Sequence, residues 1–219
     1  MNLIQKRLPS SRSSLFICAL YIIHLSALIG VYLGYIQWFL SKTWAILFLI
    51  FLVIWDGLPK KSIKISWPIP AIFFIGFIAE WLGVKFGFLF GDYSYGANLG
   101  MKLDDIPIIM GINWVILSLA TRGIIQRFFK FPVIKILISS VLMVSLDVLL
   151  EPLAPRLDYW SFDTMVAPLS NYMGWLVYSI LMQSLLELVQ FKGHFNISVH
   201  ILIIQLFFFG SLYFLLFNS

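Results

Sequence analysis

Long apolar stretches separated by short polar segments fill most of the chain. Each spans or nearly spans a hydrocarbon core about 30 Å thick, which takes roughly 20 helical residues. The stretches are Leu15–Phe39, Trp44–Trp55, Trp67–Leu82, Ile106–Ala120, Val133–Leu153, Tyr172–Val189 and Ile197–Phe217. The second, third and fourth are short, so we expect them to extend into their flanks or to tilt. The pattern predicts an all-α, polytopic transmembrane bundle of about seven helices in one integral membrane domain, residues 1–219.

Composition supports a membrane protein. Hydrophobic residues make up 61% of the chain, charged residues 11%, and the mean hydropathy is +0.95. A soluble domain would be about 45–50% apolar and about 25% charged. The single Cys18 excludes an internal disulfide and a cysteine-rich metal site. Three histidines are too few for a histidine-rich di-iron centre.

Lysine and arginine fall unequally on the two sides of the predicted bundle. Eleven share the side of the amino terminus: Lys6, Arg7, Arg12, Lys60, Lys61, Lys64, Arg122, Arg127, Lys130, Lys135 and Lys192. The opposite side has four: Lys42, Lys85, Lys102 and Arg156. The positive-inside rule then predicts a cytoplasmic amino terminus and an outer carboxyl terminus. The first apolar stretch is too long for a signal peptide, so we expect it to be retained.

Four acidic residues interrupt the apolar stretches: Glu80, Asp147, Glu151 and Glu187. A carboxyl group at bilayer depth costs about 2.5–3.5 kcal/mol on the insertion scale, so such residues usually have a role. The predicted topology brings the first three toward the outer side. Glu187 lies toward the inner side, where we expect it to pair with a cation such as Lys192 or a loop lysine.

Asp147 and Glu151 are four residues apart, so on a helix they share one face. Two neighbouring carboxyl groups in a medium of low dielectric constant cannot both ionise cheaply, and one should keep its proton. A retained proton is what a general acid requires. The structural alternative is that Glu151, just before Pro152, caps the helix or points outward while Asp147 ties two helices together.

The segment after Glu80 is rich in glycine and aromatic residues. Glycines permit turns that side chains forbid, and aromatic residues favour the membrane interface. The segment can therefore be a lid over the bundle or an ordinary interfacial loop. For Asn113 and Gln183 within helices we expect interhelical hydrogen bonds. Asn171 is a candidate N-cap, and we expect His24 to serve in helix packing.

Metal chemistry has little support in the sequence. Asp147-x-x-x-Glu151 resembles the acidic motifs that hold magnesium and diphosphate in membrane prenyltransferases. Those enzymes need further acidic residues and basic groups for the diphosphate. The outer half of the bundle is poor in lysine and arginine, so we predict no metal site.

Two blocks of residues resemble the membrane carotenoid hydratase family. The first is Glu80-x-x-Gly83-x-x-x-Gly87-x-x-Phe90-Gly91-x-Tyr93-x-Tyr95, followed by Leu103-x-x-Ile106-Pro107 and Asn113-Trp114. The second is Asp147-x-x-x-Glu151-Pro152, Tyr159-Trp160 and Asn171-x-x-Gly174-Trp175. This motif-bearing core covers about residues 67–189. The chain differs from the family's usual pattern at Glu151, where Asp is usual, and at Val84 and Phe86, where hydroxyl residues are expected.

The resemblance implies an enzyme that adds water to the terminal double bond of an acyclic carotenoid end, without a cofactor. It implies catalytic roles for Asp147, Glu80, Glu151 and Asn171. It implies a substrate-binding site formed by Trp81, Phe90, Asp92, Tyr93, Tyr95, Asn113, Trp114, Trp160 and Trp175. The implied location is the bacterial inner (cytoplasmic) membrane, where membrane lipids surround the protein and a carotenoid enters from the bilayer. Association with other carotenoid-pathway enzymes is a further implication, and nucleic acid is not an expected partner.

Two other classes of function stay open from the residues alone. A small transporter can use intramembrane carboxyl groups as proton or ion relays. Against it, the sequence contains no apparent inverted repeat. A non-catalytic carotenoid- or lipid-binding protein would use the same aromatic residues but would tolerate loss of the carboxyl groups.

Overall fold

The computed structural model describes residues 11–58 and 67–217. Within these ranges the chain forms eight helices. They are α1 (Ser11–Tyr32), α2 (Ile36–Leu40), α3 (Thr43–Gly57), α5 (Pro68–Phe86), α6 (Ile108–Ile125), α7 (Pro132–Leu150), α8 (Leu169–Leu188) and α9 (Phe195–Phe217). Helices are expected here because a backbone in lipid must satisfy its own hydrogen bonds.

Five of these helices are long and apolar enough to cross a membrane: α1, α5, α6, α7 and α9. Helix α3 is apolar but has only 15 residues, and α8 has 20 residues with several polar ones. The protein is therefore a multi-pass membrane protein. The number of crossings and the cytoplasmic amino terminus stay predictions. Of the basic residues behind that orientation, Lys6, Arg7, Lys60, Lys61 and Lys64 lie outside the described residues.

The helix boundaries correct one prediction and confirm another. The first apolar stretch is not one helix, because the chain turns at Gly34, whose φ of 89° is left-handed, and α2 follows as a separate short helix. The third and fourth stretches extend into their flanks, to 19 residues in α5 and 18 in α6. Their apolar cores alone underestimate their lengths because the flanking turns contain Lys85 and Arg122.

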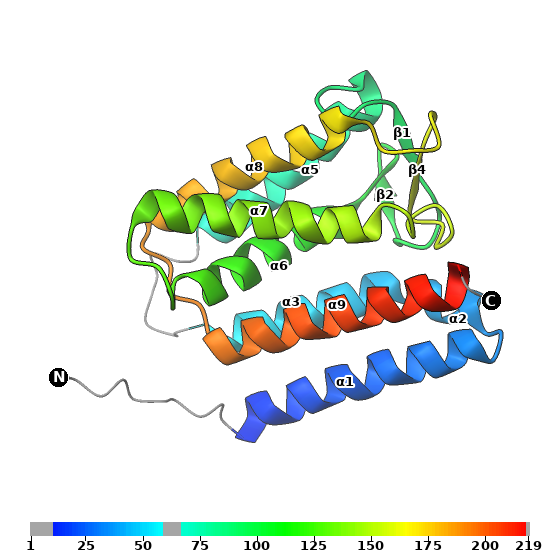
Figure 1. The fold of residues 1–219 in the computed structure, drawn as a ribbon, viewed down its shortest axis with the longest axis horizontal. Coiled ribbons are helices and arrows are strands. Elements are labelled where there is room, and N and C mark those ends of the chain that lie inside the picture. The colour runs from blue at the N-terminus through cyan, green and yellow to red at the C-terminus, as the bar shows by residue number, and fades with distance from the viewer. Residues whose placement is uncertain (1–10, 59–66, 218–219) are drawn as a thin grey trace.

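Helix α6 is the central element of the bundle. It packs against α3, α5, α7, α8 and α9. Its 18-residue apolar stretch is 78% buried inside the protein. The corresponding stretches of α1, α5, α7 and α9 are only 22–33% buried. Figure 1 shows α5, α6, α7 and α8 on one side of the molecule and α1, α3 and α9 on the other. The first residue of α1 and the last of α9 lie at opposite ends of the bundle.

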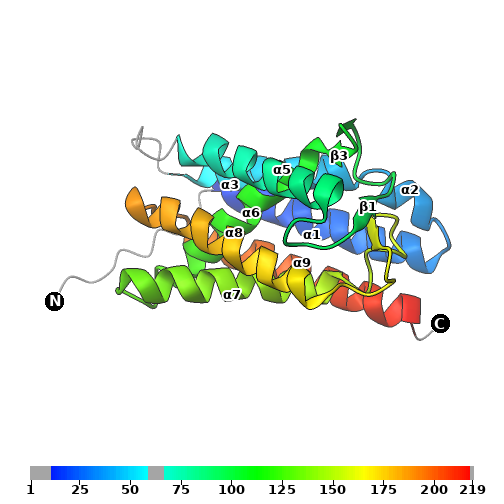
Figure 2. The ribbon, with the colours of Figure 1, turned by 90° about the horizontal axis from the view of Figure 1, so that it is seen from above.

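Short strands lie over one end of the bundle, a feature that an all-α prediction misses. Strand β1 (Tyr93–Tyr95) pairs antiparallel with β4 (Trp160–Phe162), and β2 (Lys102–Leu103) pairs with β3 (Ile106–Pro107). In the first pair Tyr95 lies opposite Trp160. Side chains alternate along a strand, so the aromatic residues of β1 and β4 point inward and their serines point outward. Figure 2 shows β1 at this end of the helical bundle.

A buried ionic network joins α6, α7 and α8 away from these strands. Arg122 is only 1% exposed, and its guanidinium donates to Glu187 Oε2 at 2.7 Å and to the side chain and backbone oxygens of Gln183. Lys135 donates to Glu187 Oε1, also at 2.7 Å. Gln183 in turn donates to the Ser118 carbonyl oxygen at 3.1 Å, which confirms its interhelical bond. Glu187 thus pairs with Arg122 and Lys135 rather than with Lys192.

Replacing Glu187 by leucine should destabilise the bundle strongly. Arg122 would keep its charge in a buried site without a carboxylate, and breaking a buried pair costs about 3–5 kcal/mol. We expect a large fall in the thermal unfolding temperature of the detergent-solubilised protein. The control is Asp105→Asn, which breaks an exposed pair with Lys85 and should change stability by about 1 kcal/mol or less. Equal unfolding temperatures for the two variants would contradict this account.

Candidate active site

Glu80 lies on α5 inside a cage of three hydrogen-bond donors. The hydroxyls of Tyr93 and Tyr95 donate to its Oε2 at 2.6 and 2.7 Å, and the indole of Trp114 donates to its Oε1 at 2.8 Å. Glu80 is only 3% exposed. Three donors converge on this buried carboxyl group, and hydrogen bonds of this kind favour its ionised form.

Gly83 of the first motif and Gly76, one turn before Glu80 on α5, let these aromatic side chains approach Glu80. A Cβ on Gly83 would lie 2.8 Å from the Tyr93 hydroxyl oxygen, and one on Gly76 would lie 2.5 Å from the Trp114 ring. Gly87 ends α5 in the left-handed conformation, with φ 61°. The chain then turns back, and Phe90 is buried against Tyr178. The segment after Glu80 therefore folds over the end of the bundle and covers this carboxylate.

Asn171 bridges the other two acids. Its amide nitrogen donates to Asp147 Oδ2 at 3.1 Å and to Glu151 Oε1 at 2.9 Å. Trp160 donates to Glu151 Oε2 at 3.3 Å. Asp147 Oδ1 is buried and has no partner within the described part of the chain. Among the oxygens of these three acids, Asp147 Oδ1 is thus the one left for a further interaction.

Asn171 differs from its structural interpretation, and Glu151 agrees with one part of its own. Asn171 is not the N-cap of α8, because that helix begins at Leu169 with Pro168 as its cap. Its side chain turns inward to the acids instead. Glu151 is the C-cap of α7, which confirms the capping alternative, but it does not point outward, since it is only 9% exposed.

Burial changes the proton affinity of the groups that surround Glu80 and Asp147. Burial raises the pKa of Glu151 to about 7, against opposing hydrogen bonds from Trp160 and Asn171. Burial and the nearby charge of Glu80 raise the pKa of Tyr93 and of Tyr95 well above its ordinary value. Both phenols therefore remain protonated and donate to Glu80, whereas Glu151 titrates in the physiological range.

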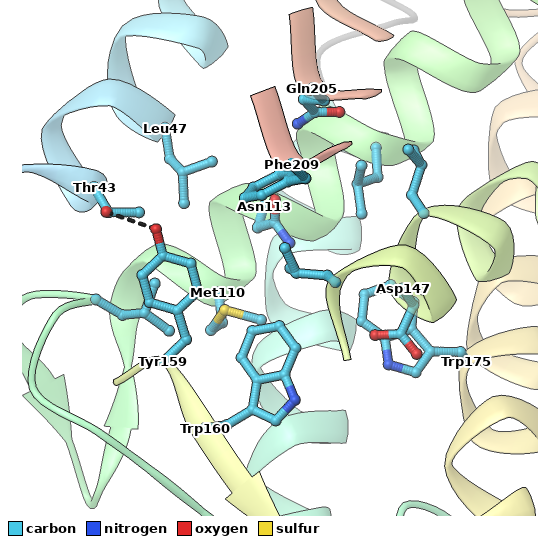
Figure 3. A pocket seen from close by; sticks show the side chains of 14 residues that line it. Thr43, Leu47, Met110, Asn113, Asp147, Tyr159, Trp160, Trp175, Gln205 and Phe209 are labelled. Atoms are coloured by element: carbon cyan, nitrogen blue, oxygen red, sulfur yellow. Dashed lines mark hydrogen bonds between the residues drawn. The ribbon is translucent and has the colours of Figure 1, made fainter. Parts of the chain in front are cut away.

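Two adjoining spaces lie beside these acids. A cavity of about 600 Å³, called here the first cavity, contains Asp147 among mostly apolar side chains. A smaller space of about 250 Å³, the polar chamber, is lined by Glu80, Glu151, Asn171 and the aromatic residues around them. Met110, Trp160 and Trp175 line both. Figure 3 shows Asp147 and Trp175 on one side of the first cavity and Thr43 with Tyr159 on the other.

The structure brings most of the predicted site residues together. Those that line the polar chamber or the first cavity are Glu80, Phe90, Tyr93, Tyr95, Asn113, Asp147, Glu151, Trp160, Asn171 and Trp175. Trp114 contacts the site through Glu80 and stacks on Trp175, with ring centroids 3.9 Å apart.

Two predicted substrate-binding residues lie elsewhere. The indole of Trp81 donates to Asp104 at 2.6 Å in an exposed contact. Asp92 accepts a hydrogen bond from the Asp163 backbone through its own carbonyl oxygen. Neither residue lines the first cavity or the polar chamber. Both residues are close to motif residues in the sequence, but their side chains do not line the site.

Sequence reasoning missed several lining residues. Thr43 and Leu47 of α3, Tyr159 before β4, and Gln205 and Phe209 of α9 all contribute to the first cavity. Thr43 and the Tyr159 hydroxyl are 2.9 Å apart. Gln205 carried a usable signal, since it is a polar residue in an apolar helix. Tyr159 also carried one, because it belongs to the second motif block, whereas Thr43, Leu47 and Phe209 look like ordinary interface or core residues. No group of three His, Cys, Asp or Glu residues suited to a metal ion occurs within residues 11–58 and 67–217.

The chain is similar in sequence to known proteins. A bisanhydrobacterioruberin hydratase from Haloarcula japonica is 26% identical over 112 residues, which cover 45% of this chain and 36% of the relative. The chain thus spans little more than a third of that relative's length. No solved structure matches the chain significantly. The family described as carotenoid biosynthesis protein matches residues 19–217, well beyond the motif-bearing core. The chain therefore belongs to the carotenoid biosynthesis protein family.

Proposed function

We propose that the protein is a carotenoid hydratase of the lyase class. It adds water across the terminal C1′=C2′ double bond of an acyclic carotenoid end, of the γ-carotene or lycopene type, and forms a 1′-hydroxy carotenoid. The proposal includes a location in the bacterial cytoplasmic membrane, which the resemblance implies, and the distribution of basic residues between loops supports its orientation there. Family membership and the name of the hydratase relative support a carotenoid substrate.

The observation that carries the proposal is the free oxygen of Asp147 beside the apolar cavity. Oδ2 of Asp147 is bound by Asn171, while Oδ1 has no partner among the described residues. Both oxygens of Glu151 accept hydrogen bonds, as an ionised carboxylate does. If Asp147 and Glu151 together hold one proton, that proton is therefore on Asp147, and Glu151 is ionised. An alkene in the first cavity would meet a carboxylic acid and no competing basic side chain.

The reaction needs a proton donor, a site for a tertiary cation and a base for water. Asp147 gives its proton to C2′ of the terminal double bond, and the positive charge develops on the more substituted C1′. Water then attacks C1′, its oxygen forms the new C–O bond, and its released proton passes to Glu151. The pair starts and ends with one proton, so no cofactor or co-reactant other than water enters the balance.

Glu80 and the aromatic residues supply the electrostatic part of the mechanism. Because three donors already occupy the oxygens of Glu80, it is a poorer base than Glu151 and acts as a fixed negative charge. Trp160 and Trp175 line both the first cavity and the polar chamber. A cation over an aromatic face gains about 0.5–2 kcal/mol, and more when water is excluded.

The Asp147→Asn variant should accumulate unhydrated pigment in a host that makes lycopene or γ-carotene. It keeps the shape of the side chain but has no acidic proton, and loss of a general acid lowers the rate by about 10²–10⁴-fold. The measurement is chromatography with mass spectrometry of the extracted carotenoids, in which each hydrated end adds the mass of one water. Glu80→Gln should also accumulate unhydrated pigment.

Asp105→Asn is the matched control, since this aspartate is exposed on the β2–β3 turn and contacts Lys85. Wild-type yields of hydroxylated product from both Asp147→Asn and Glu80→Gln would refute the assignment. Bound pigment without any hydroxylated product, in the wild-type protein as in both variants, would favour a non-catalytic carotenoid-binding protein. A small transporter would instead show proton-linked uptake in vesicles.

The hydration rate should depend on pH through Glu151. Below its pKa of about 7, Glu151 holds a proton and cannot accept one from water. The rate should therefore fall about tenfold for each pH unit below 7 and level off above it. Glu151→Gln should have a lower rate and a flat profile over this range. Initial rates in liposomes buffered on both sides test this, and a wild-type rate that increases as the pH falls would contradict Glu151 as the base.

A further inference from the structure

A second cavity lies between the amino-terminal helices and α9, outside the site described above. Its volume is about 670 Å³, and its lining comes from α1, α2, α3 and α9 together with Tyr159 and Thr43. The residues that line both this second cavity and the first are Thr43, Leu47, Tyr159, Gln205 and Phe209. The two cavities therefore adjoin along a shared wall of α3 and α9.

The lining of the second cavity is suited to a hydrocarbon. Its side chains are apolar apart from His24, Thr43, Tyr159 and Gln205. Thr43 and Tyr159 bind each other, and the Nδ1 of His24 donates to the Leu20 carbonyl oxygen at 2.7 Å. Gln205 is 6% exposed, and its Oε1 has no partner within the described part of the chain. A long apolar ligand would thus meet few polar groups that need water.

Length is the reason to connect the two cavities. The second cavity follows α1 from Ile23 to Val31, which is about 12 Å at 1.5 Å per residue. The first follows α6 from Met110 to Leu117, about 10 Å. A linear carotenoid is much longer than either stretch. A substrate with its reacting end at Asp147 must therefore continue past the first cavity.

We propose that the second cavity binds the distal part of the linear polyene while the terminal double bond lies beside Asp147. The inference rests on the proposed hydratase function and adds a second subsite to it. In this arrangement Gln205 and Phe209 lie at the junction of the two cavities, and the wall formed by α1 and α3 selects for long substrates. Hydration of a short isoprenoid alkene with the same terminal group uses the first cavity alone.

The test fills the second cavity and compares substrates of two lengths. Ile50 lines this cavity, does not line the first, and is 2% exposed. In liposomes, Ile50→Trp should lower the hydration rate of lycopene at least about tenfold, because the indole takes the space that the polyene would occupy. The rate with a C20 acyclic isoprenoid alkene should stay within about twofold. The matched control is Leu52→Trp, which makes a similar change on the exposed face of α3 and should affect neither rate.

A second variant approaches the cavity from α1. Ala27→Trp fills the same space, and its control is the exposed Ile29→Trp on the same helix. The C20 rate reports in each preparation whether the protein is folded. If both filling variants leave the lycopene rate unchanged, or lower the two rates equally, the subsite is refuted. If the wild-type protein hydrates neither substrate, the proposed function itself fails.

Discussion

The structure depends on keeping three carboxyl groups buried at one end of an apolar bundle. Each would cost several kcal/mol in lipid without hydrogen bonds. Glu80 is satisfied by Tyr93, Tyr95 and Trp114, and the other two acids share the amide of Asn171. These donors come from β1, α6 and α8, so the acids fix how the loops fold over the helices. The short strands and the turn at Gly87 follow from that requirement.

The two ends of the bundle solve the problem of buried charge differently. At the end away from the strands, Glu187 is neutralised by Arg122 and Lys135, and each oxygen of its carboxylate has a cation. At the strand end no lysine or arginine contacts Glu80, Asp147 or Glu151 among the described ion pairs. Ion pairing makes the first network a structural element. Acids without a counter-cation, next to a cavity, are suited to exchange protons and to stabilise a developing positive charge.

Much of the bundle could be predicted from the apolar stretches, and most of the acidic site from the cost of burying carboxyl groups. The break at Gly34 could not be predicted, because a left-handed turn there leaves the hydropathy of the first apolar stretch unchanged. The strands could not be predicted because two or three residues are too few to show the alternation of apolar and polar side chains that identifies a strand. The resemblance implies a substrate-binding role for Trp81, but this residue directly follows Glu80, and adjacent residues on a helix point about 100° apart and rarely share a pocket. Thr43, Tyr159 and Phe209 meet the cavity only through tertiary packing.

The shared proton connects the geometry of the acids to the proposed chemistry. Infrared spectroscopy of the protein in liposomes at about pH 8, a unit above the pKa of Glu151, can detect it through the carbonyl stretch of a protonated carboxyl group. The wild-type protein should give this band at that pH, Asp147→Asn should lose it, and Glu80→Gln should keep it. A wild-type spectrum without the band, or a band that persists unchanged in Asp147→Asn, would contradict a proton held on Asp147.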